Sequence, residues 1–119
     1  DVSKERVVYG IPFTKSSEIP DIVDASQYIV KAVVKEIHIE APHINRDTYL
    51  CTVTETLRGS TDDEILIVLF KDTVTIGSEY IFLLNKDTED SLIYALSSVN
   101  SVVDLEKEKS VAEEITALT

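Results

Sequence analysis

The chain has 119 residues, 44% hydrophobic and 28% charged, so it is long enough for one domain with a buried core and is not disordered as a whole. Its formal net charge of −11 disfavours nucleic acid and anionic membrane surfaces as partners, because both attract mainly Lys and Arg. The longest apolar run, residues 65–70, is far shorter than the roughly 20 residues of a membrane-spanning helix, so no direct membrane insertion is expected.

The amino-terminal part predicts a tether, a short strand and a brief helix. Residues 1–6 are polar and charged, as in a frayed chain end, and residues 6–11 form a strand candidate. Residues 20–25 predict one or two helical turns that begin at Pro20, where a missing N–H group costs nothing. Because the chain begins at Asp1 and contains no Met, we expect that a signal segment was removed or that the chain was trimmed.

Residues 28–40 predict a long strand with a change of phase. Alternate residues from 28 to 34 are aromatic or aliphatic and would share one face, whereas Ile37 and Ile39 fall on the opposite parity. A strand changes face only through an extra residue, so we expect a β-bulge or sharp bend near residues 35–36. Curved strands of this kind close small barrels.

Residues 46–57 predict the next strand, with one face of threonines and one of mainly apolar residues. The threonines suit a solvated outer face, because β-branched side chains fit a pleated surface. The inner face is assigned to Tyr49, Cys51, Val53 and Leu57, and the outer face to Thr48, Thr52, Thr54 and Thr56.

The remaining strands alternate with short polar turns. The continuous apolar run at residues 64–70 suggests a strand buried on both faces. The predicted strands are 64–70, 79–84, 91–97 and a short one within 99–105, and the predicted turns are 41–45, 58–63, 71–78 and 85–90.

The last segment changes to a helical period. Val111, Ile115 and Leu118 recur at helical spacing, and Ser110 with Glu113 matches a capping box. We therefore expect an amphipathic helix over residues 110–118. Its apolar stripe suits packing on its own barrel and homodimer formation equally well.

Three local patterns line up along the chain. Residues 25–34 (ASQYIVKAVV) lead into a long strand, residues 53–59 (VTETLRG) close a strand on a basic residue and glycine, and residues 76–84 (IGSEYIFLL) lead from a glycine into a strand. Their order resembles the small OB-fold domains of the tissue inhibitors of metalloproteinases and the netrin-like modules. More closely, it resembles bacterial exported or lipoprotein-anchored domains of that shape whose function is uncharacterised. The resemblance covers residues 16–104.

The expected fold is therefore a single, mainly β domain over residues 1–119. It is a five- to six-stranded, partly open OB-type barrel with a short helix before the first long strand and a carboxy-terminal amphipathic helix. The animal inhibitors place an amino-terminal cysteine on the protease zinc, whereas this chain begins with Asp1 and its one cysteine is Cys51. Protease inhibition therefore does not carry over from the resemblance. The bacterial group implies export, with or without a lipid tether upstream of Asp1.

Few residues suggest chemistry. Cys51 is either a buried small hydrophobe or a nucleophile, and no local motif provides the base that a nucleophile needs. His38 and His43, with Glu36 and Glu40 nearby, are candidate metal ligands, although two surface histidines explain the pattern as well.

Carboxylates are the other candidate residues for binding or catalysis. The acidic clusters, Asp62-Asp63-Glu64 and the group formed by Asp87, Glu89 and Asp90, lack the spacing of an EF-hand loop and are interpreted as solvated turns. Glu55 shares the parity of the inner face, so we expect it to be paired, with Lys31 or Arg46, rather than catalytic.

The sequence favours a non-enzymatic, exported, cell-surface domain that binds a protein or other extracellular ligand and needs no cofactor. An exposed strand edge would offer backbone hydrogen bonds to such a partner. Two alternatives remain open. One is a protease-inhibitor-like module, suggested by the shape, and the other is an intracellular scaffold, suggested by the unpaired cysteine and the amphipathic helix.

Overall fold

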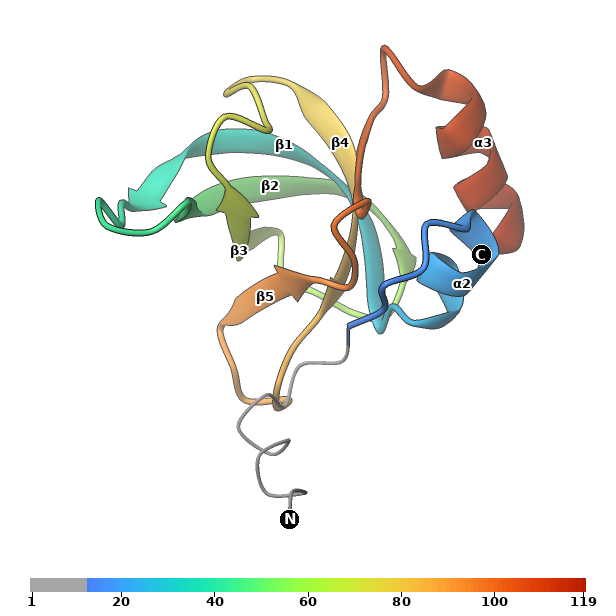
Figure 1. Ribbon diagram of the computed structural model, residues 1–119, viewed down its shortest axis with the longest axis horizontal. Helices are drawn as coiled ribbons and strands as arrows, with labels where there is room; N and C mark the ends of the chain where they lie inside the picture. The colour runs from blue at the N-terminus through green and yellow to red at the C-terminus, as the bar shows by residue number, and fades with distance from the viewer. Residues whose placement is uncertain (1–12) are drawn as a thin grey trace.

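The predicted alternation of strands and turns produces six β-strands and two helices in the computed structural model, which describes residues 13–119 (Figure 1). The predicted tether at residues 1–6 and strand at residues 6–11 lie outside the described residues. None of the described helices is long and apolar enough to cross a membrane. The elements are α2 (Ile19–Asp24), β1 (Tyr28–Ile39), β2 (Arg46–Arg58), β3 (Glu64–Phe70), β4 (Glu79–Asn85), β5 (Ile93–Leu96), β6 (Val102–Asp104) and α3 (Lys109–Leu118).

The strands form a closed five-stranded barrel, which confirms the expected mainly β fold. The sheet order is β1-β2-β3-β5-β4, and β4 pairs back onto β1 to close the ring. The β3–β5 pairing is parallel and the others are antiparallel, while β6 adds to β4 as the sixth strand. The two helices lie together on one side of the barrel, opposite the tip of the β1–β2 hairpin (Figure 1).

The bulge expected near residues 35–36 is present. Val34 pairs with Cys51 and Glu36 with Leu50, so Lys35 is the extra residue in β1. The β1–β2 register also shifts beyond Ile37, and again within β2. Bulges bend a strand and increase its twist. The bends let the first half of β1 pair with both β2 and β4, whereas its second half pairs, among the described strands, with β2 alone.

These register shifts correct two assignments in β2. Leu57 does not join the inner face, because the register shift between Lys31 and Ala32 reverses the parity of β2 after Val53, and Leu57 packs on the helix side of the sheet. Thr48, expected on a solvated face, is buried. Threonines nearer the other end of β2, such as Thr54 and Thr56, are exposed as expected.

Two hydrophobic cores share the barrel wall. The barrel interior holds alternate residues of the strands, and the second core lies between the barrel and the helices. β4 is the strand with two buried faces, since Tyr80 and Phe82 point into the barrel core while Ile81 and Leu83 join the helix-side core. β3 was expected to be buried on both faces, but it alternates between buried and half-buried residues, because neither α2 nor α3 covers its outer side.

Helix α3 packs on its own barrel, mainly through Ala112 and Ile115. Leu118, predicted to belong to the apolar stripe, is 44% exposed because the helix ends there. The predicted capping box is wrong, since the helix starts at Lys109 and its N-cap residue Glu108 makes no side-chain cap. The homodimer through α3 stays a prediction, because the centre of the stripe is used within the chain.

Asn85, expected in an acidic turn, is the fully buried last residue of β4. Its Oδ1 accepts a hydrogen bond from the Gln27 backbone N–H at 2.6 Å, and its Nδ2 donates to the Ala25 carbonyl at 2.9 Å. Arg58 donates from Nη1 to the Val23 carbonyl at 2.6 Å. These bonds fasten the segment between α2 and β1 to the barrel.

Candidate functional site

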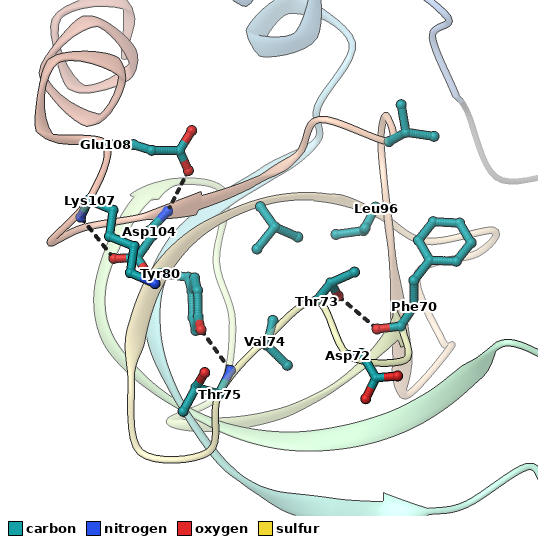
Figure 2. Close-up of a pocket in the computed structure, with 12 residues that line it drawn as sticks. Phe70, Asp72, Thr73, Val74, Thr75, Tyr80, Leu96, Asp104, Lys107 and Glu108 are labelled. Atoms are coloured by element: carbon teal, nitrogen blue, oxygen red, sulfur yellow. Dashed lines mark hydrogen bonds between the residues drawn. The ribbon is translucent and has the colours of Figure 1, made fainter.

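One pocket lies at a mouth of the barrel and has a volume of about 430 Å³ (Figure 2). Its floor is apolar and belongs to, or packs against, the barrel core. The β3–β4 loop borders one side, and the turn between β6 and α3 borders the other (Figure 2). The floor and wall include Phe70, Val74, Tyr80, Leu96 and Val102.

Hydrogen bonds fix the pocket's rim. The Thr75 backbone N–H donates to the Tyr80 hydroxyl at 2.7 Å, and the Thr73 hydroxyl donates to the Phe70 carbonyl at 2.7 Å (Figure 2). Asp72 adopts a φ of 63°, a left-handed conformation that Asp tolerates better than most residues and that turns the loop over the pocket.

The rim of the pocket carries charged side chains. Asp104 Oδ1 accepts hydrogen bonds from the backbone N–H groups of Glu106 and Lys107, so this carboxylate is committed to the turn. Asp72 and Glu108 add two further carboxylates, and Lys107 adds one cation. None of the lining residues is Ser, Cys or His. The arrangement suits binding of an apolar group that enters past a polar rim.

A second feature, the free edge of β1, is formed by residues 35–39. The β1–β4 hydrogen bonds end where the Gly77 N–H donates to the Val34 carbonyl and the Val34 N–H donates to the Ser78 carbonyl. Beyond that point β1 pairs with β2 on one side only. No strand among residues 13–119 pairs with the other side, and all five side chains are exposed.

Large apolar side chains accompany this free edge. Ile37 and Ile39 lie on it, Ile44 lies in the hairpin turn, and Ile76 precedes Gly77 at the end of the β1–β4 pairing. Isoleucines are among the most frequently buried residues, so their gathering near an unpaired edge is informative. Their exposed fractions are 40%, 51%, 58% and 54%, in that order.

Asp47 holds the hairpin to the neighbouring loop. Its Oδ1 accepts a hydrogen bond from the Ala41 N–H at 3.0 Å and lies 3.1 Å from the Lys71 ammonium. The Ala41 N–H, and with it Lys71, lowers the pKa of Asp47 although burial opposes that shift. The Lys71 N–H also donates to the Asn45 carbonyl at 3.1 Å. Asp47 was not among the residues predicted from the sequence, where its one signal was a carboxylate within a strand pattern.

The predicted metal ligands do not meet in a site. His38 lies on the free edge and His43 in the hairpin turn, and both are exposed, as are Glu36 and Glu40. Residues 13–119 contain no group of three or more His, Cys, Asp or Glu side chains placed to hold a metal ion.

Cys51 is fully buried in the barrel core, as the first interpretation expected. Burial raises the pKa of its thiol to about 12, so the thiolate needed by a nucleophile is not populated at neutral pH. Cys51 is therefore a packing residue.

Glu55 is paired, as expected, but points outward rather than inward. Its carboxylate lies 3.2 Å from the Lys31 ammonium, and its side chain is exposed because β2 changes parity after Val53. Arg46, the other expected partner, instead lies over the ring of Phe70 at 5.4 Å. The Glu55–Lys31 pair is a surface contact between neighbouring strands.

The two acidic clusters, separate in sequence, converge in space. Asp62 and Glu64 from one cluster and Glu89 and Asp90 from the other line a single cavity at the barrel end opposite the mouth pocket. Sequence analysis treated them as independent turns, since only the barrel topology brings the β2–β3 and β4–β5 loops together.

Compared with known proteins, the sequence matches no protein-family model and no curated protein. The features that bear on function are therefore the free edge of β1, the mouth pocket and the charged cavity.

Proposed function

We propose that this domain is a non-enzymatic binding module that takes up an extended segment of a partner protein along the free edge of β1. The observation that carries the proposal is the edge at residues 35–39, which no other strand among residues 13–119 pairs with and which extends beyond the closed ring of β1, β2, β3, β5 and β4. Unpaired strand edges bind extended peptides through main-chain hydrogen bonds, while side-chain pockets provide specificity.

The composition of the edge indicates the partner's chemistry. Ile37 and Ile39 offer apolar contacts, whereas Glu36 and Glu40 are exposed carboxylates beside them. The whole chain carries a formal net charge of −11. A segment that alternates apolar side chains with Lys or Arg complements both features, and its basic residues would speed association.

The mouth pocket extends the same surface. The β3–β4 loop connects the two features, because Gly77 of this loop bonds to Val34 at the end of the free edge while Asp72, Thr73 and Thr75 line the pocket. A partner segment that leaves the edge at Val34, where Gly77 and Ser78 take over the pairing, would pass over this loop toward the pocket. Register shifts on either side of Ile37 limit the regular docked stretch to a few residues.

Selection from a phage-displayed library of random linear peptides tests the binding mode. We expect enriched peptides to be basic and apolar in alternation. The double variant I37K/I39K places two charges on the edge. It should bind the synthesised peptides about tenfold or more weakly than the wild type. L92K is the matched control, because Leu92 is also exposed but lies at the far end of the barrel. Equal affinity for I37K/I39K and wild type, or no enrichment, would overturn the proposal.

The location outside the cytoplasm is proposed on the family resemblance alone. Fractionation of the native cells, followed by mass spectrometry of the intact protein, tests it. A lipid-modified or processed amino terminus in the extracytoplasmic fraction supports export. Recovery of unmodified protein from the cytoplasm alone would contradict export and favour the intracellular scaffold.

A further inference from the structure

At the barrel end opposite the mouth pocket, a lysine is held by two tyrosine rings. The Lys86 ammonium lies 5.2 Å from the ring centre of Tyr28 and 5.0 Å from that of Tyr94. The two rings meet edge to face, with centres 5.1 Å apart and an angle of 90° between their planes. We call Tyr28, Tyr94 and Lys86 the tyrosine cage. Aromatic faces at this distance attract cations through the ring quadrupole.

The cage adjoins an acidic cavity of about 470 Å³. Tyr94 and Lys86 line this cavity together with Asp62, Glu89 and Asp90. Glu64 also lines it, but the Lys35 ammonium lies 2.9 Å from that carboxylate. The other three carboxylates form no ion pair among the described residues, so the cavity holds an excess of negative charge around one ammonium group.

Among residues 13–119, no carboxylate forms a salt bridge with Lys86. Its ammonium donates a hydrogen bond to the Glu89 carbonyl at 3.1 Å. Burial raises the pKa of the Tyr94 hydroxyl, and the nearby Lys86 ammonium opposes that rise. Lys86 is half-buried, directly follows β4 and has a long, flexible side chain. An ammonium group that contacts two rings and one carbonyl can leave the cage without breaking an ion pair. The Lys86 ammonium therefore occupies a place that an external cation could take.

The cavity fits an organic cation better than a metal ion. Residues 13–119 offer no group of three acidic, His or Cys side chains placed for a metal. The cavity wall also includes Leu66 and the highly exposed Leu92, which would contact alkyl substituents. Ring faces, dispersed carboxylates and aliphatic walls are the features that recognise alkylated ammonium groups.

We propose that the tyrosine cage binds the alkylated ammonium group of a cationic ligand, and that Lys86 occupies the cage when the ligand is absent. Binding displaces the Lys86 ammonium into solvent and involves no covalent step. None of the three cage residues belongs to the free edge of β1, so the cage proposal does not depend on the proposed peptide binding.

Titration with tetramethylammonium and choline, followed by NMR of the tyrosine ring signals, tests this proposal. Saturable shifts confined to Tyr28 and Tyr94 are expected. K86M removes the internal competitor and should tighten binding about threefold or more, whereas Y94L should abolish it. Y94F keeps the ring and should retain binding, which separates loss of the cage from a folding defect.

The matched control is the Arg46–Phe70 pair. It is a second contact between a cation and an aromatic ring, and it lies outside the cage. R46M should leave tetramethylammonium binding unchanged. Unsaturable or uniform shifts in both wild type and K86M would overturn the proposal. So would weaker binding by K86M, because that result would make Lys86 a structural part of the site rather than its occupant.

Discussion

The Asp47 carboxylate lies 3.1 Å from the Lys71 ammonium, and this pair fastens the β1–β2 hairpin to the β3–β4 loop. The same carboxylate accepts the Ala41 N–H at the start of the hairpin turn. The free edge of β1 and the loop that borders the mouth pocket are thus held in one arrangement by a single side chain. The integrity of the proposed binding surface should depend on Asp47.

Asp47→Asn should lower the free energy of unfolding at neutral pH and speed hydrogen exchange in the hairpin. The hydrogen bond from the Ala41 N–H, and with it Lys71, lowers the pKa of Asp47 below its ordinary value of 3.8. A lowered folded-state pKa stabilises the fold above pH 3.8, and this stabilisation is lost as the pH falls through the folded-state value. Urea unfolding of both proteins across that range should show the difference disappear in acid.

The matched control is the exposed ion pair Lys35–Glu64, at 2.9 Å. Lys35→Met should change the unfolding midpoint at neutral pH much less than Asp47→Asn, because exposed ion pairs are screened by solvent. Equal effects of the two substitutions would show that the Asp47 contacts are no more than surface electrostatics.

Cys51 should be inert to thiol reagents in the folded protein. It is fully buried, and burial raises the pKa of its thiol to about 12. At pH 8 we expect reaction with a disulfide reagent only after unfolding. Cys51→Ala should cost about 1 kcal/mol of stability through lost packing. Cys51→Ser should cost more, because it buries a hydroxyl in an apolar core. Rapid labelling of the native protein would contradict this assignment.

The amphipathic patterns predicted most of the barrel, because strand period and turn residues are local properties. The bulge at Lys35 was predictable from the change of parity in β1, whereas the register shifts in β2 were not. Those shifts moved Leu57 to the other core and turned Glu55 outward. A parity argument fails after each unseen bulge, since one extra residue reverses every side chain that follows.

The candidate sites were less predictable, because they depend on contacts between distant segments. The tyrosine cage joins the start of β1 to the β4–β5 region, and the acidic cavity joins two loops that sequence analysis treated separately. The buried role of Asn85 was hidden for the same reason, since its partners Ala25 and Gln27 precede it by about 60 residues. An exposed strand edge was predicted from the sequence, but its position on β1 followed only from the strand register.

Gly59 should be far less tolerant of substitution than Gly77, although both have positive φ, at 80° and 94°. A Cβ atom at Gly59 would lie 2.7 Å from Tyr28 Cδ2 and 2.9 Å from the Gln27 carbonyl oxygen. At Gly77 it would meet no atom within 4 Å. Gly77→Ala should therefore show only the backbone strain, about 1–2 kcal/mol, and Gly59→Ala that strain plus a steric clash.

Thermal unfolding of the two glycine variants provides the measurement, and NMR of the Tyr28 ring reports the clash directly. Only Gly59→Ala should shift the Tyr28 signals, because this ring packs against Gly59 and also belongs to the tyrosine cage. Equal losses of stability would mean that the chain beside Gly59 relaxes without strain.

Substitutions of Ile115 and Leu118 distinguish packing of the α3 stripe on its own barrel from homodimer formation. Ile115 is fully buried between the barrel and α2, so Ile115→Ala should cost about 2–5 kcal/mol. Leu118 is 44% exposed at the helix end, and Leu118→Ala should stay within about 0.5 kcal/mol. Urea unfolding at several protein concentrations checks both values. A homodimer through α3 would make the Leu118→Ala effect larger and dependent on concentration, since association adds stability by mass action. An effect of Leu118→Ala that stays small at every concentration would leave α3 as a helix that stabilises only its own barrel.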